Sequence, residues 1–246
     1  MQVVLLAAGV GKRLGATTQT LPKCLLEVHG QTLLERHLRT FLQTGIDEAI
    51  VVTGHCSEQI HAAADRLALA LPIPWVWNPR FPQGSILSLA EGLKTVHQDV
   101  IIMDADVYYG PPLFERLMRS AHANCVLIDP SASETGEEMM IGVRDARAVT
   151  IARSLKTTGP YDLQGESVGF FKVSAQDVAT LRQVIEQTVV ELGGDVEYES
   201  AIDRFFKVAN VGFESTDGLA WTEIDFEQDL VRARDVIAPL LRESIA

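Results

Sequence analysis

Residues 3–13 read Val-Val-Leu-Leu-Ala-Ala-Gly-Val-Gly-Lys-Arg, and Pro-Lys follows at residues 22–23. The apolar residues Val3–Ala7 predict a buried strand that runs into a turn containing Gly9 and Gly11. Glycines in such a turn let backbone N–H groups approach anionic oxygens, and the basic side chains that follow offset the remaining charge. The stretch therefore predicts a strand that ends at a nucleotide-binding loop.

The glycine turn does not match the two best-known phosphate loops. A Walker loop reads Gly-x-x-x-x-Gly-Lys before Ser or Thr, but Leu6 occupies the first glycine position and Arg13 the Ser/Thr position. A dinucleotide fingerprint, Gly-x-Gly-x-x-Gly/Ala, has Leu14 in its third place. Taken alone, the glycine pair is equally consistent with a plain tight turn.

Apolar strand-like runs alternate with amphipathic helical stretches through the first half of the chain. The expected strands are Val3–Ala7, Glu48–Thr53, Pro74–Trp77, Val100–Met103 and Cys125–Ile128. The expected helices are Thr32–Leu42, Ser57–Leu69, Ile86–Val96 and Pro112–Ala121. This alternation predicts a Rossmann-like α/β fold, with a mixed, mainly parallel sheet flanked by helices. Ligands of such sheets bind at the carboxyl ends of the strands, where the glycine turn lies.

The second half of the chain has a different pattern. Shorter strands are expected at Met139–Val143, Ala148–Ala152 and Ser167–Val173, and long helices at Ala175–Leu192 and Phe226–Arg242. No repeat, low-complexity tract or Pro/Gly/Ser linker interrupts the sequence. We therefore expect one domain over residues 1–246, in which residues from about 130 to 215 form a small acceptor-side insertion.

Composition limits the partners of this protein. With 246 residues, 47% of them hydrophobic, the chain can bury a substantial core. A net charge of −12 argues against a nucleic-acid partner, but not against a nucleotide, because local cations decide nucleotide binding. The excess carboxylates have two interpretations, solubility and recognition of a cationic substrate group.

Sequence features also indicate where the protein works. The apolar runs are short and broken by charges, so we expect no membrane contact, and the first strand begins too early to leave room for a signal peptide. Cys24, Cys56 and Cys125 are widely spaced and form no zinc pattern. These features predict a cytoplasmic protein, with a homodimer as one option for its assembly.

Two acidic residues follow the apolar run Val100–Met103. Asp104 and Asp106 are two positions apart, so both side chains point to the same side of an extended segment. Carboxylate oxygens after a strand, close to a phosphate loop, suit Mg²⁺. A helix cap or a turn is the alternative interpretation, and the nearby glycine turn favours the metal.

A second acidic cluster precedes the last expected helix, in Trp221-Thr-Glu-Ile-Asp-Phe-Glu-Gln-Asp229. Its Asp225 has two interpretations: it caps the helix, or it is a second metal ligand brought in from far along the chain. Both place an acidic side chain at the start of the helix, so the residues alone leave them open.

Taken whole, the first stretch resembles the Leu-Ala-Ala-Gly-x-Gly-x-Arg-Leu…Pro-Lys signature of the nucleotidyltransferase superfamily, whose members activate sugar phosphates and alcohol phosphates with nucleoside triphosphates. The resemblance implies that Lys23 and Arg13 are catalytic. Lys23 would steady the α-phosphate and the incoming oxygen, while Arg13 and Lys12 would hold the leaving pyrophosphate. It implies nucleotide contacts from Leu6, Ala7, Ala8, Gly9, Gly11, Lys12, Arg13, Lys23 and Asp104.

The string Glu223-Ile-Asp225…Asp229 resembles the ending of choline-phosphate and related cytidylyltransferases, where the aspartate of Glu-Ile-Asp helps to hold magnesium. This resemblance implies that Asp106 and Asp225 are the ligands of Mg²⁺. Asp104 and Glu223 would then support the pair from the nucleotide side and the acceptor side.

The strings at residues 165–173 and 197–203 look like the same phosphocholine cytidylyltransferase-like branch, which includes enzymes for 2-aminoethylphosphonate. The resemblance covers nearly the full chain and is looser between residues 130 and 162. It implies a Mg²⁺-dependent cytidylyltransferase that transfers CMP from CTP to a phosphorylated or phosphonate aminoalcohol and releases pyrophosphate. The acceptors it implies are 2-aminoethylphosphonate, phosphocholine and phosphoethanolamine.

Pro82-Gln83-Gly84-Ser85 opens an expected helix, and Ser85 alone is a suitable helix cap. In the superfamily the corresponding Gly-Ser/Thr turn reads the edge of the nucleobase. The resemblance therefore implies that Gln83, Gly84 and Ser85 contact the base. No physical feature of these residues separates cytosine from uracil or thymine.

An ammonium-bearing acceptor requires carboxylates and aromatic faces around its cation. The residues expected to bind the acceptor are Glu138, Lys156, Glu166, Tyr198, Asp203 and Glu223. Core packing or a solvated surface is the alternative interpretation for each of them. Met139 and Met140 stand where the choline enzymes carry aromatic residues, which favours a primary amine over a trimethylammonium group.

Two other functions fit parts of the sequence. A sugar-1-phosphate nucleotidyltransferase using UTP or TTP shares the first stretch, but predicts hydroxyl-binding groups where this chain offers carboxylates. A non-catalytic nucleotide-binding regulator predicts degraded signature residues, whereas Arg13, Lys23, Asp106 and Asp225 are all present.

Overall fold

The computed structural model describes residues 1–14, 20–132, 134, 136–156 and 159–243, without the side chains of Lys12 and Glu243. Within these residues a nine-stranded sheet forms the centre of the molecule. Its main path runs through β10 (Arg147–Ala152), β9 (Met140–Arg144), β11 (Leu163–Val173), β6 (Val100–Asp104), β1 (Gln2–Ala7), β4 (Glu48–Thr53) and β5 (Trp75–Trp77). β8 (Asn124–Asp129) pairs with β11, and β12 (Val211–Ser215) pairs with β8.

The middle of the sheet is parallel. β1 lies between β6 and β4 and is parallel to both, with Leu6 opposite Asp104 and Ala7 opposite Thr53. The carboxyl ends of these strands therefore meet at one edge of the sheet, where ligands of α/β proteins bind. β11 is antiparallel to β6, β8 and β9, so it joins the parallel strands to the second half of the chain.

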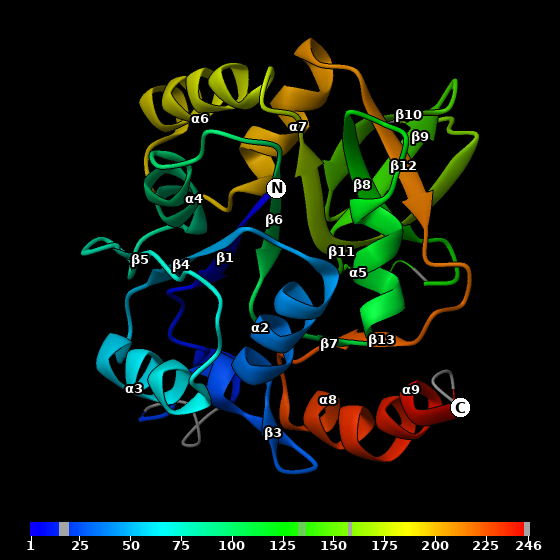
Figure 1. Cartoon of the computed structure of the whole chain (residues 1–246). Coiled ribbons are helices and arrows are strands. Elements are labelled where there is room, and N and C mark those ends of the chain that lie inside the picture. The colour runs from blue at the N-terminus through cyan, green and yellow to red at the C-terminus, as the bar shows by residue number, and fades with distance from the viewer. Residues whose placement is uncertain (15–19, 133, 135, 157–158, 244–246) are drawn as a thin grey trace.

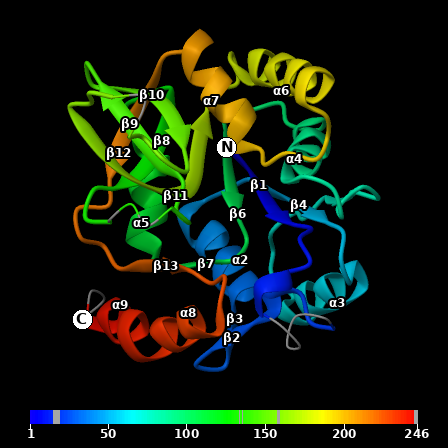
Figure 2. The same ribbon diagram turned by 180° about the vertical axis from the view of Figure 1, so that it is seen from behind.

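Helices cover both faces of the sheet (Figure 1), and the view from behind shows the same layers (Figure 2). One face packs against α2 (Leu33–Thr44), α3 (Ser57–Leu67) and α5 (Pro111–Met118). The other face packs against α4 (Ser85–Leu93), α6 (Val178–Leu192) and α7 (Glu199–Val208). Side chains alternate along a strand, so Val3 and Leu5 join the first layer and Val4 the second. The predicted α/β fold is confirmed.

The last helix differs from the prediction of one continuous helix over Phe226–Arg242. The chain forms α8 (Glu227–Arg232), a π-helical turn over Ala233–Ile237, and α9 (Ala238–Glu243). Pro239 has no backbone N–H, so it cannot continue the regular hydrogen-bond ladder of an α-helix. The wider turn ends at Ile237, two residues before this proline.

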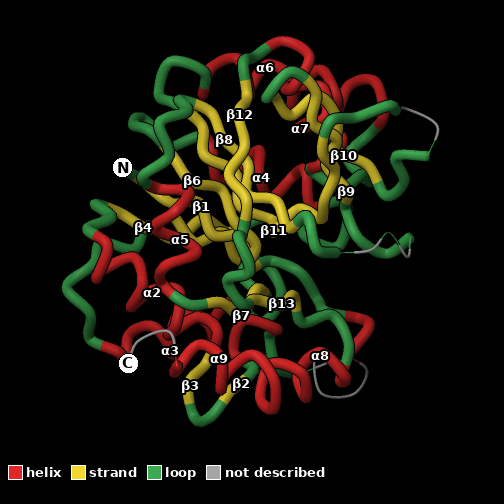
Figure 3. Tube along the Cα trace, turned by 90° about the vertical axis from the view of Figure 1, so that its right-hand side faces the viewer, coloured by secondary structure: helices red, strands yellow, loops and turns green. Residues whose placement is uncertain are grey.

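A two-stranded ribbon that the sequence analysis missed carries the end of the chain back to the sheet. β7 (Val107–Tyr109) follows β6 and pairs with β13 (Trp221–Glu223), which precedes α8. Figure 3 shows this ribbon between the large sheet and the C-terminal helices. No helix in the described part of the chain is long and apolar enough to span a bilayer.

Candidate active site

The glycine loop forms one wall of a cavity of about 370 Å³ at the carboxyl ends of β1 and β6. β1 ends at Ala7, and a 3₁₀ turn over Lys12–Leu14 follows the loop. Gly11 has φ = +66°, a backbone conformation that side chains with a Cβ rarely adopt. The sequence-predicted residues that line this cavity are Leu6, Ala7, Ala8, Gly9, Gly11, Arg13, Lys23, Gln83, Ser85, Asp104, Asp106 and Asp225.

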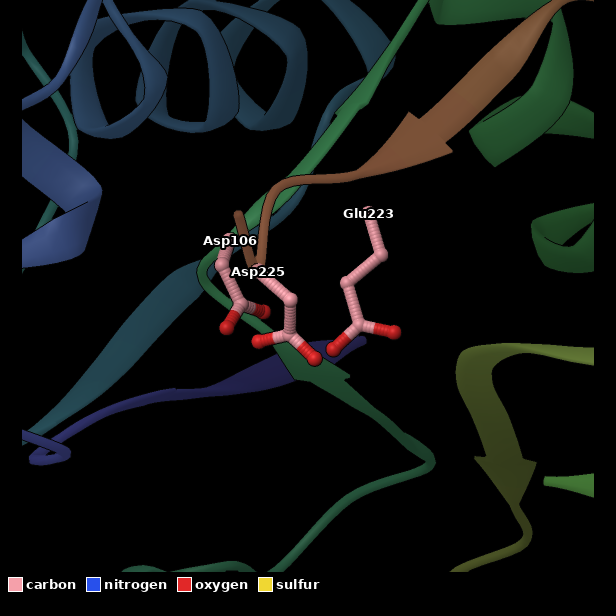
Figure 4. Close-up of side chains that lie close together, drawn as sticks. All are labelled: Asp106, Glu223 and Asp225. Carbon is pink, nitrogen blue, oxygen red and sulfur yellow. The ribbon is translucent and has the colours of Figure 1, made fainter. Parts of the chain in front are cut away.

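Three carboxylates gather beside this cavity. Asp106, Glu223 and Asp225 each offer an oxygen within 4.8 Å of the others. Figure 4 shows their carboxylates pointing the same way, Asp106 from the segment after β6 and the other two from the segment that includes β13. The N–H of Ile224 donates to the carbonyl of Asp106 at 3.0 Å, which joins the two segments. Three hard oxygen donors of this kind suit Mg²⁺.

Lys23 and Arg13 lie against the same carboxylates. Lys23 Nζ donates to Asp106 Oδ2 at 3.0 Å and also to Asp225 Oδ1, and Arg13 Nη1 donates to Asp225 Oδ2 at 2.7 Å. Lys23 comes from a 3₁₀ turn over Lys23–Leu25, directly after Pro22. The fold thus brings Lys23 and Arg13, the predicted phosphate-binding cations, together with Asp106 and Asp225, the predicted ligands of Mg²⁺.

The local charges hold these groups ionised. Burial opposes the charge of Lys23, but Asp106 and Asp225 outweigh it and raise the pKa of this amine above its usual value. Burial also opposes the charge of Asp225, but Lys23 and Arg13 outweigh it and lower the pKa of this carboxyl. The pair is therefore a cation and an anion near neutral pH.

Asp104 occupies a different environment from Asp106. Tyr198 Oη donates to Asp104 Oδ2 at 2.6 Å, and a Cβ on Gly169, which has φ = +77°, would lie 2.7 Å from the same oxygen. Burial, followed by the charge of Asp106, raises the pKa of Asp104 well above its usual value. Tyr198 is itself buried and acts on the site through Asp104.

The turn before α4 forms the opposite wall of the first cavity. Gly84 is the N-cap of α4, and a Cβ there would lie 2.0 Å from the carbonyl oxygen of Val196. Ser85 Oγ accepts from the N–H of Tyr198 at 2.9 Å, so this side chain does not cap the helix. Ser85 lines the cavity, whereas Gly84 does not. The absence of a Cβ at Gly84 allows Val196, in the segment before α7, to approach closely.

Some lining residues of the first cavity were missed by the sequence analysis. Ser88 lies one helical turn after Ser85, and its hydroxyl accepts from Asn78 Nδ2 at 3.0 Å. A second small polar residue on the same face of the expected helix was the available signal. The other missed residues are Val10, Cys24, Phe81, Pro82 and Ala105.

A second cavity, of about 710 Å³, lies next to the first and is acidic. Asp225 lines both cavities. The acidic side chains of the second cavity are Asp129, Glu137, Glu138, Glu166, Glu223, Asp225 and Asp229. A third cavity of about 250 Å³ shares Arg13 and Asp104 with the first and Glu137 and Glu166 with the second. The three cavities therefore share their walls around the carboxylate cluster.

Hydrogen bonds separate the carboxylates of the second cavity into two kinds. Trp221 Nε1 donates to Asp129 Oδ2 at 2.8 Å. Burial opposes the charge of Asp129, but hydrogen bonds from Ser131 and Trp221 outweigh it and lower its pKa. Burial, with the charges of Glu138 and Asp129, raises the pKa of Glu166 to about 7. A nearby cation would therefore stabilise the ionised form of Glu166.

The structure does not bring every predicted acceptor residue to the cavities. Asp203 Oδ1 accepts from Thr150 Oγ1 at 2.6 Å and from the N–H of Ile151 at 3.0 Å, so it ties α7 to β10. The side chain of Lys156 is 77% exposed and lies 3.8 Å from Glu134. Neither residue lines any of the cavities described here. The side chain of Lys12 lies outside the described residues.

Residues 3–168 match the family of the MobA-like NTP transferase domain. The match covers more than half of the chain, and the chain belongs to this family.

Known proteins are similar over most of the chain. The "Bifunctional IPC transferase and DIPP synthase" of Rubrobacter xylanophilus is 28% identical over 237 residues, which cover 94% of this chain and 51% of the relative. The "CMP-5'-(3-aminopropyl)phosphonate synthase" of Streptomyces rubellomurinus is 25% identical over 232 residues, which cover 92% and 37%. The chain thus spans about half of the first relative and less of the second.

A solved structure shares the fold. The inositol-1-phosphate CTP transferase from T. maritima superposes with a TM-score of 0.80 at 16% identity, over 98% of this chain and 95% of that chain. This similarity confirms the nucleotidyltransferase arrangement of sheet and helices.

Proposed function

We propose that this protein is a Mg²⁺-dependent cytidylyltransferase that transfers CMP from CTP to a phosphate or phosphonate bearing an amino group. One observation carries the proposal: an acid-lined cavity shares its wall with a carboxylate cluster and a glycine loop. The loop and cluster suit a metal–triphosphate, and the acidic cavity suits an acceptor that is anionic at one end and cationic at the other.

The reaction requires one bond to form and one to break. An oxygen of the acceptor phosphate or phosphonate attacks the α-phosphorus of CTP, and the bond from that phosphorus to the bridging oxygen of the leaving pyrophosphate breaks. Lys23 steadies the α-phosphate and the incoming oxygen, and Arg13 binds the leaving pyrophosphate. Such catalysis is positioning and electrostatics, with no covalent enzyme intermediate.

Asp106, Glu223 and Asp225 are the residues that would hold Mg²⁺. The bound ion would offset the charge of the triphosphate, which otherwise repels the anionic acceptor. The contacts of Lys23 and Arg13 with the same carboxylates support this assignment, because they place two cationic side chains beside the metal site, where they can bind the phosphate oxygens.

The second cavity is the proposed acceptor site. Glu138, Glu166, Asp129 and Trp221 line this cavity, and the three carboxylates would surround the ammonium group of an acceptor. Five of its lining residues, Ser131, Ala132, Glu137, Glu138 and Glu166, come from the segment of residues 130–215, which supports a contribution of this segment to the acceptor side. The name of the Streptomyces relative contains an aminopropylphosphonate, which supports an amine. We propose 2-aminoethylphosphonate, phosphocholine or phosphoethanolamine as acceptor, with a primary amine preferred.

The alternatives have weaker support. A sugar-1-phosphate acceptor does not use the concentration of carboxylates in the second cavity. A binding protein without catalysis does not require Arg13, Lys23, Asp106 and Asp225 to meet at one point. Cys24, Cys56 and Cys125 are free thiols, which supports the cytoplasm as the place of the reaction, and the homodimer stays a prediction.

A pyrophosphate-release screen tests the proposal. Four nucleoside triphosphates are combined with phosphocholine, phosphoethanolamine, 2-aminoethylphosphonate and several sugar-1-phosphates, each with and without Mg²⁺. We expect release with CTP, Mg²⁺ and an amine-bearing acceptor. Activity confined to sugar phosphates, or to UTP or TTP, would overturn it.

A further inference from the structure

His37 is a fully buried histidine that contacts the turn between Asp104 and Asp106. It lies on α2, and His37 Nε2 is 3.2 Å from the carbonyl oxygen of Ala105. His37 Nδ1 is 3.2 Å from Tyr109 Oη. Its ring also packs against Tyr109, with ring centroids 5.4 Å apart. Both ring nitrogens therefore have a partner inside the core.

These contacts define where the ring proton lies. A carbonyl oxygen only accepts hydrogen bonds, so His37 Nε2 carries the hydrogen. Burial lowers the pKa of His37 to about 3, so the ring is neutral and Nδ1 accepts from the hydroxyl of Tyr109. The hydroxyl of Thr40, one turn after His37 on α2, also hydrogen-bonds Tyr109. Each group thus donates to the next, from Thr40 to Tyr109, from Tyr109 to His37, and from His37 to the carbonyl of Ala105.

The turn held by His37 is anchored at two further points. The N–H of Ala105 donates to the carbonyl of Leu6 on β1 at 3.2 Å. The carbonyl of Asp106 accepts from the N–H of Ile224, between Glu223 and Asp225. The turn is therefore held from three sides. β1 binds the N–H of Ala105, His37 binds the carbonyl of Ala105, and Ile224 binds the carbonyl of Asp106.

We propose that His37 is a positioning residue for the carboxylate cluster: by donating to Ala105 it holds Asp106 where Glu223 and Asp225 can share one cation. This inference rests on the proposed function, since it takes the cluster as a divalent-cation site. His37 itself touches neither substrate nor cation.

Divalent-cation binding by variants of the full chain tests the proposal, with Mn²⁺ as the probe in calorimetry. His37→Leu removes both hydrogen bonds, and we expect Mn²⁺ to bind about tenfold more weakly, as for other residues that orient metal ligands indirectly. His37→Gln keeps an amide N–H at the position of Nε2, and we expect it to restore most of the affinity. Thr188→Val is the matched control, because Thr188 Oγ1 donates to Val184 within α6, and this fully buried bond is remote from the cluster.

The possible outcomes separate this proposal from the proposed function. Unchanged Mn²⁺ affinity in His37→Leu, or an equal loss in Thr188→Val, would overturn the role of His37 and leave the cation site in place. Absence of Mn²⁺ binding in the wild-type chain would overturn the cation site and this inference with it.

A measurement on the wild-type chain covers the case in which His37→Leu does not fold. In ¹⁵N spectra we expect His37 to remain the neutral Nε2–H form from pH 5 to pH 8. The Nε2–H signal should shift when Mg²⁺ is added. An Nδ1–H form, or a signal that Mg²⁺ leaves unchanged, would contradict the proposal.

Discussion

The nucleotide side and the acceptor side of this site are built in different ways. The nucleotide side is centred on the end of β1 and the loop that follows, which contribute backbone groups, and on the basic side chains of Arg13 and Lys23. The acceptor side is built mainly of side chains, which come from β8, β11, β13 and α8 and from the segments that join them. A loop that binds through its backbone keeps its ligand when single side chains change, whereas a site made of side chains can change its ligand by single substitutions.

The largest expected effect tests the nucleotide side. Lys23→Ala removes the cation that contacts Asp106 and Asp225, so these carboxylates lose their compensation and the reacting phosphate loses its donor. We expect kcat/KM for the acceptor to fall by at least about 10²-fold, while circular dichroism shows a folded chain. Pyrophosphate release under saturating CTP measures the loss.

Lys156→Ala is the matched control for this substitution. Lys156 is 77% exposed and lines none of the three cavities, so its removal should leave pyrophosphate release near the wild-type rate. Near-normal turnover in Lys23→Ala would remove this lysine from the mechanism. A strong loss in Lys156→Ala would restore this residue to the acceptor site.

A smaller, selective effect tests the acceptor side. Glu166→Gln removes a carboxylate of the second cavity with almost no change of volume. We expect the KM for an amine-bearing acceptor to rise about tenfold, because a hydrogen bond to a charged group is lost, while the KM for CTP stays within about twofold. Steady-state kinetics with each substrate varied in turn separates the two constants.

Glu186→Gln is the control for Glu166→Gln, since Glu186 is an exposed residue of α6. Equal increases of both KM values in Glu166→Gln would mean that the two sides of the site are not separable. That result would contradict the division between a nucleotide half built on a backbone loop and an acceptor half built of side chains.

The sequence was most informative where residues that act together are neighbours in the chain. The glycine loop follows β1 directly, and Asp104 and Asp106 lie at the end of β6, so the parallel pairing of these strands brings the two features together. Tyr198 and Asp203 were harder to interpret. Tyr198 directly precedes α7 and contacts Asp104, whereas Asp203 lies in the middle of α7 and ties it to β10, and only the orientation of the helix decides these contacts. His37 gave no signal, because a histidine on the apolar face of a helix is ordinarily a core residue.

The dependence on pH gives a second test of the acceptor side. Glu166 has a pKa of about 7, so it ionises between pH 6 and pH 8. We expect kcat/KM for the acceptor to rise severalfold over this range in the wild-type protein. In Glu166→Gln this rise should be absent, and the pH dependence that remains reports the ionisation of the substrates. A profile that is identical in both proteins would remove Glu166 from acceptor binding.

The raised pKa of Glu166 also predicts how the stability of the protein changes with pH. Its pKa in the folded chain lies above the usual value of 4.5, so the folded state binds the proton more tightly than the unfolded state does. The contribution of Glu166 to stability is therefore fully present below pH 4.5 and is lost as the pH rises through about 7. Urea unfolding at pH 5 and pH 8 should show Glu166→Gln gaining stability relative to wild type at the higher pH.

The smallest expected effect concerns Trp221, which acts on the acceptor side through Asp129. Trp221→Phe keeps an aromatic ring but removes the donor that lies 2.8 Å from Asp129 Oδ2. A single hydrogen bond contributes about 1 kcal/mol, so we expect the acceptor KM to rise by no more than about fivefold, with the KM for CTP unchanged. Trp77→Phe is the control, because Trp77 is 61% exposed on the edge strand β5. If Trp221→Phe instead alters CTP binding, the two sides share more of their structure than their separate origins in the chain suggest.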